Sequence, residues 1–345
     1  MVGQTHSMST ENPTPETTTP QTTNPEPTES LQPDAPRTDR PLTGKTAVVA
    51  GATRGAGRAI ALDLAAAGAF VWCTGRSSAD RPSDYGRPET IEGTLDLIRE
   101  AGGDGEAVVC DHLVDADLAA LAGRIQAVSG AIDILVNDIG GEAYVSWGEK
   151  LWTADPAAGR RLFDAGLLTH LSTARTLLPL LISRPGGLHI EITDGTSEYN
   201  TTHFREAVWL DLTKTAVSRL AFGLSHELAD SGATAVALTP GWLRSEMMLE
   251  GFDTREDTWM ADSLDPAREV PPVDFAISET PHLLGRGIVA LAADPDRNRF
   301  TGQTLSSFAL AETYDLRDVD GTRPDAWGFL AAKETDPHAD PRAFR

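Results

Sequence analysis

The segment AVVAGATRGAGRAIA, residues 47 to 61, carries the clearest chemical signal in this chain of 345 residues. It has the pattern of a buried strand, a tight turn and the start of a helix, with Gly51, Gly55 and Gly57 in the spacing GxxxGxG. Glycines let the backbone approach a pyrophosphate, and the N-terminus of the following helix attracts its negative charge. We therefore predict that these glycines bind a dinucleotide.

Two arginines indicate which dinucleotide is bound. Arg76 follows the next apolar run, at the point where an NAD-binding protein has an acidic side chain on the ribose, and Arg54 lies inside the glycine-rich turn. Guanidinium groups can bind the 2′-phosphate of NADP, each charge-assisted hydrogen bond contributing about 1.5 to 3 kcal/mol. We expect NADP(H) as the cofactor; the alternative is that both arginines are solvated loop residues.

The elements that must position these groups follow a repeating order from Thr43 onward, in which short apolar runs alternate with longer helical stretches. The runs are rich in Val, Ile and Ala, which is typical of strands in a parallel sheet covered on both faces. This alternation predicts an α/β fold with one Rossmann-type, doubly wound parallel sheet of about seven strands. We expect strands at 46–51, 69–75, 105–111, 132–138, 187–193, 234–240 and near 303–310, and helices at 57–68, 90–102, 116–130, near 157–184, at 212–232 and at 285–295.

Composition divides the chain into regions. Residues 1–40 hold ten Thr and seven Pro and no Ile, Phe, Trp or Tyr, so we expect a disordered tail there. The sheet domain should span 41–310, with a lid over the substrate at 241–281, because ligands bind beyond the carboxyl ends of strands in such sheets. Residues 311–345 form a C-terminal extension that we expect to be irregular or partly disordered.

The charge balance, 51 acidic against 29 basic residues for a net charge of -22, argues against nucleic acid or a membrane as the main partner. Cys73 and Cys110 each close an apolar run, so we predict buried free thiols in a cytoplasmic protein. No apolar run approaches the roughly 18 residues that a membrane span needs. The eight histidines show no paired spacing, so no metal site is predicted.

Five motifs in order resemble the short-chain dehydrogenase/reductase family over roughly residues 44–310. They are GATRGAG, CD at 110–111, LVND at 135–138 in place of the family's NNAG, the lysine of VWLDLTK at 208–214, and TPGW at 239–242. The spacing after the second strand and the run PGWLRSEMM most resemble the branch typified by dehydrogenase/reductase member 1. The resemblance implies hydride transfer between NADP(H) and a small organic carbonyl or alcohol, and a homo-oligomer.

The resemblance also assigns cofactor-binding positions. Asp111 would lie beside the adenine and Asn137 at the family's NNAG strand end, while Pro240 and Gly241 would form the turn beside the nicotinamide. Lys214 stands at the lysine of the family's YxxxK motif and would hold the cofactor ribose with its ammonium group.

The family's other catalytic positions have changed. Leu210 stands where the YxxxK tyrosine would be, Asp194 where the serine would be, and Gly166 where the asparagine would be. A positioned acid or base typically contributes about 10²- to 10⁴-fold to the rate, and leucine has no proton to give. Another group must therefore supply the proton, or the reaction is a different one.

Four side chains are candidates for that proton. Tyr199 and His203 lie in the loop between Asp194 and Leu210, and His203 could titrate near neutral pH. His170 lies one helical turn past Gly166 and so on a similar face, and burial could raise the pKa of Asp194. For each of them the alternative is a structural or solvated residue.

Three functions remain open at this point. The first is an NADP(H)-dependent oxidoreductase with a reorganised proton donor. The second is a non-redox enzyme of the same fold, catalysing cyclisation, dehydration or isomerisation with Asp194, Tyr199 or His203. The third is a catalytically silent cofactor-binding protein.

Overall fold

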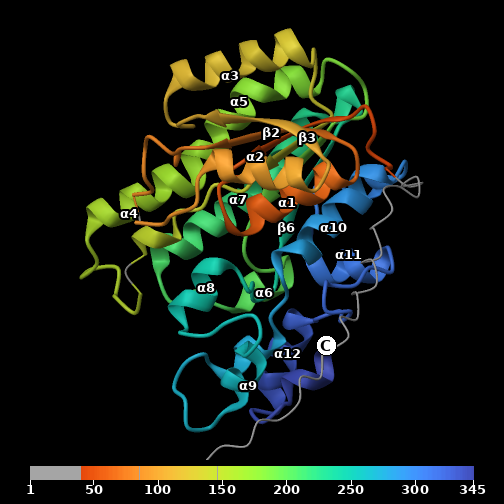
Figure 1. Cartoon of the computed structure of the whole chain (residues 1–345). Coiled ribbons are helices and arrows are strands. Elements are labelled where there is room, and N and C mark those ends of the chain that lie inside the picture. Colours follow the sequence, from red (N-terminus) through yellow and green to blue (C-terminus); the bar gives the residue numbers. More distant parts are fainter. Residues whose placement is uncertain (1–39, 85, 146) are drawn as a thin grey trace, which may run out of the picture. The chain divides into compact units, whose positions relative to one another are not determined.

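The computed structural model describes residues 40–84, 86–145 and 147–345 (Figure 1), and the tail predicted for 1–40 lies outside them except for residue 40. The described residues form a seven-stranded sheet in the order β3-β2-β1-β4-β5-β6-β7, and every neighbouring pair is parallel. The prediction of a doubly wound parallel sheet is confirmed. The strands are β1 (Thr46–Ala50), β2 (Phe70–Gly75), β3 (Asp104–Val109), β4 (Ile134–Asn137), β5 (Leu188–Ile192), β6 (Thr234–Thr239) and β7 (Thr304–Ser306).

Helices cover both faces of the sheet, as the near-continuous apolar strands require. One face packs against α1 (Gly55–Ala66), α2 (Ile91–Glu100) and α10 (Pro281–Ala293), through a core that includes Ile60, Ile98 and Ile288. The other face packs against α3 (Asp115–Val128), α5 (Thr169–Leu181) and α7 (Val208–Glu227), through residues such as Leu121 and Leu177. Both layers can be followed in Figure 1.

The long helix expected near 157–184 is divided. It consists of α4 (Pro156–Phe163), a π-helical turn (Asp164–Leu168) and α5. A Cβ atom on Gly166 in the π-helical turn would lie 2.9 Å from the Thr213 side chain, so glycine allows this turn to pack closely on α7. An asparagine at position 166 would collide with α7.

Two other predicted boundaries were wrong. Helix α7 begins at Val208 rather than 212, with Asp211 in its first turn, where a negative charge stabilises the helix dipole. The last strand ends at Ser306, because its hydroxyl accepts a hydrogen bond from the Ala309 N–H (3.0 Å) and caps α11 (Ser307–Thr313). The first difference places Leu210 and Lys214 on one continuous helix.

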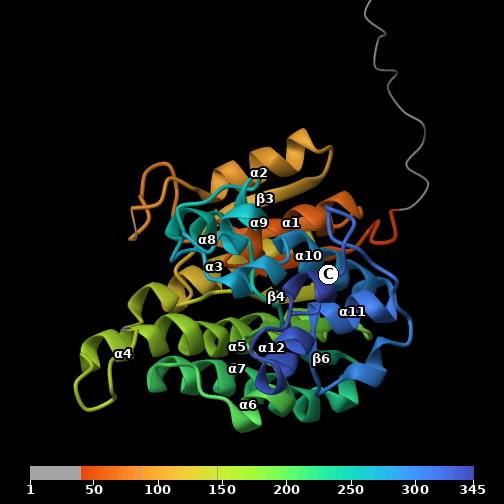
Figure 2. The ribbon, with the colours of Figure 1, turned by 90° about the horizontal axis from the view of Figure 1, so that it is seen from below.

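The segments after β6 form short elements at the end of the sheet domain where α8, α9 and α12 gather (Figures 1 and 2). They include α8 (Glu246–Gly251), α9 (Trp259–Leu264) and the 3₁₀ turn Val273–Ile277. The extension expected to be irregular contains α12 (Ala326–Thr335), followed by the 3₁₀ turn Pro341–Phe344. Asp325 caps α12, and Phe329 packs with Ile277 and Trp242, so this extension is built against the predicted lid.

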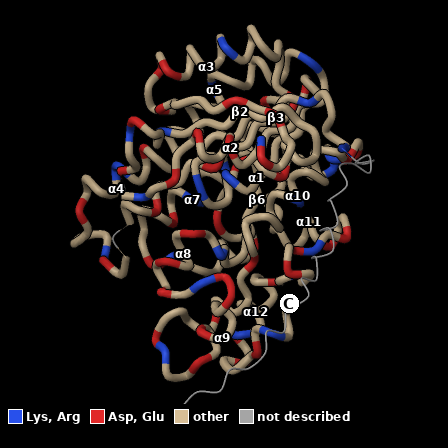
Figure 3. The backbone as a smooth tube through the Cα atoms, viewed as in Figure 1, with Lys and Arg blue, Asp and Glu red and all other residues tan. Residues whose placement is uncertain are grey.

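Acidic side chains are spread along most elements of the fold, with basic ones among them (Figure 3). Cys73 and Cys110 are free and buried, as predicted. Among the described residues, no helix is long and apolar enough to span a membrane. The same residues contain no cluster of three or more His, Cys, Asp or Glu side chains arranged to hold a metal ion.

Candidate active site

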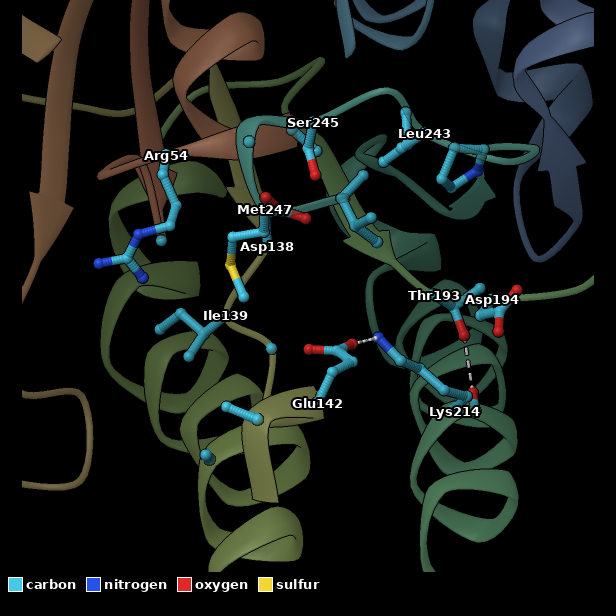
Figure 4. Close-up of a pocket in the computed structure, with 18 of the residues that line it drawn as sticks. Arg54, Asp138, Ile139, Glu142, Thr193, Asp194, Lys214, Leu243, Ser245 and Met247 are labelled. Atoms are coloured by element: carbon cyan, nitrogen blue, oxygen red, sulfur yellow. Dashed lines mark hydrogen bonds and ion pairs between the residues drawn. The ribbon is translucent and has the colours of Figure 1, made fainter. Parts of the chain in front are cut away.

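A cavity of about 690 Å³ lies at the carboxyl ends of the strands. Its lining joins the glycine-rich turn after β1 to Lys214 on α7 and to side chains from α6 (Ser197–Thr202), α8 and α12. Figure 4 shows this cavity, in which the side chains of Lys214 and Glu142 meet in an ion pair. Its volume lies within the range of small-molecule sites, roughly 300 to 1,000 Å³.

The glycine-rich turn packs so closely on the protein's own backbone that Gly51 and Gly57 have no room for a side chain. Gly51 has φ +89°, and a Cβ atom on it would lie 2.5 Å from the carbonyl oxygen of Asp138. Gly55 has φ +55° and opens α1, while a Cβ on Gly57 would run into the backbone of Gly51. Such a bare backbone at a helix N-terminus fits a pyrophosphate.

The two predicted phosphate-binding arginines line the same end of the cavity. Arg54 donates to Glu89 (3.3 Å) and to Ser83 (3.1 Å). Arg76 lies 3.2 Å from Asp84 and 3.9 Å from Asp111, the residue expected beside the adenine. The arginines are therefore held by carboxylates at the rim, with the side chain of Arg76 34% exposed.

Lys214 is anchored through its helix and paired through its side chain. The Thr193 hydroxyl at the end of β5 donates to the Lys214 carbonyl oxygen (2.7 Å), which fixes α7 against the sheet. The ammonium group forms an ion pair with the carboxylate of Glu142, in the 3₁₀ turn Glu142–Tyr144 after β4. Burial disfavours the charged form, yet Glu142 holds the pKa of Lys214 above its usual value.

Leu210 lies one turn before Lys214 on α7 and lines the cavity. Its side chain is buried and packs with Leu162 and Ala207. The position that the sequence resemblance assigns to the YxxxK tyrosine therefore presents a hydrocarbon surface to the cavity.

The predicted proton donors of the loop after β5 separate into two groups. Asp194 and Tyr199 line the cavity, whereas the cavity lining among the described residues does not include His203. His203 stacks on the far side of the Tyr199 ring (centroids 3.8 Å apart) and its Nε2 lies 2.9 Å from the Glu334 carboxylate. Asp194 accepts a hydrogen bond from Arg205 Nε (2.9 Å), so its carboxylate already has a cationic partner.

His170 and Asn137 belong to a buried polar network behind the cavity. His170 binds the Glu191 carboxylate through Nδ1 and lies 2.8 Å from the carbonyl oxygen of Ile139 through Nε2. Asn137 donates to Glu191 (3.0 Å), and His189 lies 2.7 Å from the same carboxylate. Burial opposes the charge, but Glu191 holds the pKa of His170 above its usual range, which favours an ion pair between the two.

His170 was expected toward the cavity because it lies one helical turn past Gly166, but neither residue is part of the cavity lining among the described residues. Gly166 packs on Thr213 of α7, and His170 contacts the Glu191 carboxylate and the Ile139 carbonyl oxygen. The face that these two residues share is therefore used for packing inside the domain.

The turn at Pro240 and Gly241 also lines the cavity. The N–H of Gly241 donates to the Glu279 carboxyl (3.3 Å), which also accepts from the Ser307 hydroxyl (2.6 Å). Burial raises the pKa of Glu279 to about 8, so this carboxyl holds the turn without placing a charge beneath it at neutral pH.

Three cavity residues were not anticipated from the sequence. Asp138 is the last residue of LVND and directly follows β4, and Glu142 lies four residues further on. Burial raises the pKa of Asp138 to about 7 despite the charge of Lys214. Trp327 comes from α12, and its ring centroid lies 5.0 Å from that of Tyr199. Carboxylates directly after a strand end were a usable signal for the first two, whereas Trp327 depends on how the extension folds back.

A parallel, doubly wound sheet with a glycine-rich turn after its first strand defines a dinucleotide-binding fold. A family model described as short chain dehydrogenase matches residues 45–256. The chain is 32% identical over 294 residues to dehydrogenase/reductase SDR family member 1 of Mus musculus, a match that covers 81% of this chain and 85% of the relative. The chain therefore belongs to the short-chain dehydrogenase/reductase family of oxidoreductases, and the resemblance in the sequence is confirmed.

Solved structures share the fold. A 7α-hydroxysteroid dehydrogenase complexed with NADH and 7-oxo glycochenodeoxycholic acid has a TM-score of 0.59 at 22% identity and covers 83% of this chain and 97% of its own. A protein described as an NAD(P)-dependent gluconate 5-dehydrogenase from Beutenbergia cavernae, with NADP at low occupancy, has a TM-score of 0.60 at 25% identity over 78% and 98%. Among these two structures of the same fold, one contains NADH and the other contains NADP.

Proposed function

We propose that the protein is an NADP(H)-dependent oxidoreductase that interconverts an organic carbonyl and an alcohol without a tyrosine at position 210. The observation that carries this proposal is the single cavity that joins Arg54 and Arg76 to Lys214. When bound, NADPH would supply the hydride. The glycines after β1 would hold its pyrophosphate, the two arginines its 2′-phosphate, and Lys214 its ribose.

The substrate end of the cavity is lined by apolar and aromatic side chains, among them Trp242, Trp327 and Met247. This lining suits a small or medium-sized organic substrate, and its cover from α8 and α12 would exclude water from the reacting carbon. Homo-oligomeric assembly and a cytoplasmic location stay predictions from the sequence.

Turnover by the natural sequence tests this proposal. We expect loss of NADPH absorbance with members of a panel of aromatic and aliphatic ketones and aldehydes. Leu210→Tyr serves as the comparison, because a phenol would then enter the cavity one turn before Lys214. Turnover that occurs only in Leu210→Tyr would identify a lapsed reductase, and product formation without change in NADPH would favour the non-redox alternative.

A further inference from the structure

The ion pair between Lys214 and Glu142 is the direct contact that links the end of β4 to α7 inside the cavity (Figure 4). The Lys214 side chain is 15% exposed and that of Glu142 is 45% exposed. Lys214 is therefore mostly buried in the cavity, whereas part of the Glu142 side chain is exposed to solvent.

Local backbone geometry holds the Glu142 carboxylate in this place. The carboxylate folds back over Gly140, where a Cβ atom would collide with it. The glycine at position 140 thus leaves the space that the carboxylate occupies, while the other carboxylate oxygen binds the Lys214 ammonium. An ammonium group has three N–H bonds, so two remain for the cofactor ribose and the substrate oxygen.

Other acids in the cavity are placed differently. Asp194 is bound to Arg205, and Asp138 accepts a hydrogen bond from the Gly57 backbone. Tyr199 lies on α6 rather than on α7, and its ring packs against His203 and Trp327. Lys214 lies one turn past Leu210, on the helix from which the missing hydroxyl would have extended.

Resting on the proposed function, we propose that the Lys214 ammonium, positioned by Glu142, is itself the proton donor. In the reducing direction the carbonyl carbon accepts the hydride, and the carbonyl oxygen takes a proton from Nζ. The electron pair of the broken N–H bond stays on nitrogen, and the neutral amine regains a proton from solvent along the exposed edge of Glu142. Glu142 acts as a positioning residue: its carboxylate holds the Lys214 side chain in place and favours the return of a proton to the neutral amine.

The charges around Lys214 agree with this role. Glu142, Asp194 and Asp138 favour the ammonium form and together outweigh burial, which disfavours it, while His170 repels it. If the carboxylate of Glu142 is removed, burial becomes the dominant influence on the pKa of Lys214. The pKa of Lys214 should then fall, because burial disfavours the charged form of the ammonium group.

The first test uses the full chain without cofactor. Acylation of Lys214 by acetic anhydride is followed across pH by mass spectrometry in the natural sequence, Glu142→Gln and Glu149→Gln. Glu149 is an exposed control that does not line this cavity among the described residues. We expect the labelling midpoint to fall by about 1 to 3 pH units in Glu142→Gln only. An unchanged midpoint in Glu142→Gln would overturn the proposal.

The second test separates proton donation from charge. Lys214→Arg keeps a cation but cannot release its proton, so NADPH binding should persist while turnover falls about 10²- to 10⁴-fold. Glu149→Gln is the control and should retain turnover, since Glu149 is exposed and does not line this cavity among the described residues. Full activity in Lys214→Arg would overturn this inference alone. Absence of NADPH binding by the natural sequence would overturn the proposed function and this inference with it.

Discussion

The carboxylate of Glu246 accepts a hydrogen bond from the backbone N–H of Gly55 (3.1 Å), the residue that opens α1 in the glycine-rich turn. The same carboxylate lies 3.5 Å from the Arg58 guanidinium. A side chain of α8 thus holds a negative charge at the helix N-terminus that is expected to receive the cofactor pyrophosphate.

Glu246→Gln should therefore strengthen NADPH binding. Removing one negative charge near the pyrophosphate relieves repulsion that we estimate at about 0.3 to 1 kcal/mol, or about 2- to 5-fold in affinity. Fluorescence titration measures the change. Glu250→Gln is the matched control, because Glu250 lies on the same helix but pairs with Arg87. Equal changes in the two variants would show that position 246 has no special relation to the cofactor.

Arg76→Ala should weaken NADPH binding by about 10- to 100-fold and leave NADH binding unchanged, because NADH has no 2′-phosphate for the guanidinium to bind. Parallel titrations with both nucleotides provide the measurement, and NADH serves as the internal control. If both affinities fell equally, Arg76 would contact a part that the two nucleotides share.

Trp327→Ala should raise KM for the substrate and reduce kcat/KM by about 10-fold, with NADPH affinity unchanged. The indole lines the cavity beside Tyr199, and loss of that apolar contact costs about 1.5 kcal/mol. Steady-state kinetics check this against Trp152→Ala, since the Trp152 side chain is 84% exposed. A weaker NADPH affinity in Trp327→Ala would place the residue at the cofactor end instead.

The ion pair of His170 and Glu191 should be a stability determinant. His170→Leu removes one of the two histidines that contact the buried Glu191 carboxylate and leaves only His189, and we expect a loss of about 3 kcal/mol in the free energy of unfolding. Urea unfolding at pH 7 provides the value. The double variant with Glu191→Leu should lose less than His170→Leu alone; a larger loss would contradict an ion-pair role.

The same pair has a defined pH dependence. Because the pKa of His170 is raised, its contribution is complete below about 6.5 and is lost as the pH rises through its folded value. Burial opposes ionisation of Glu191, but the two histidines lower its pKa to about 2 from 4.5, so its contribution is present above 4.5 and is lost as the pH falls toward 2. The stability difference between the natural sequence and His170→Leu should shrink at both extremes. A difference independent of pH would exclude this linkage.

The sheet could be predicted because its signals are local. Each strand is a short apolar run, and the turn after β1 needs glycines that the sequence displays directly. The sequence also allowed the prediction that one cavity is lined by Asp194, Tyr199 and Lys214, because the carboxyl ends of parallel strands meet at one edge of the sheet.

The remaining features depend on contacts that no local pattern displays. His170 was expected to face the cavity together with Gly166, but Gly166 packs on α7 and His170 on Glu191 of β5. Glu142 reaches Lys214 only because the chain turns back after β4, and Trp327 reaches the cavity only because the extension packs on the predicted lid. Tertiary packing decides such positions.

NADPH fluorescence titration of the natural sequence, with NADH in parallel, tests the proposed cofactor and its site most directly. We predict saturable binding of NADPH that is about 10- to 100-fold tighter than that of NADH, as expected for guanidinium contacts to a 2′-phosphate. Absence of saturable NADPH binding, or a preference for NADH, would contradict it.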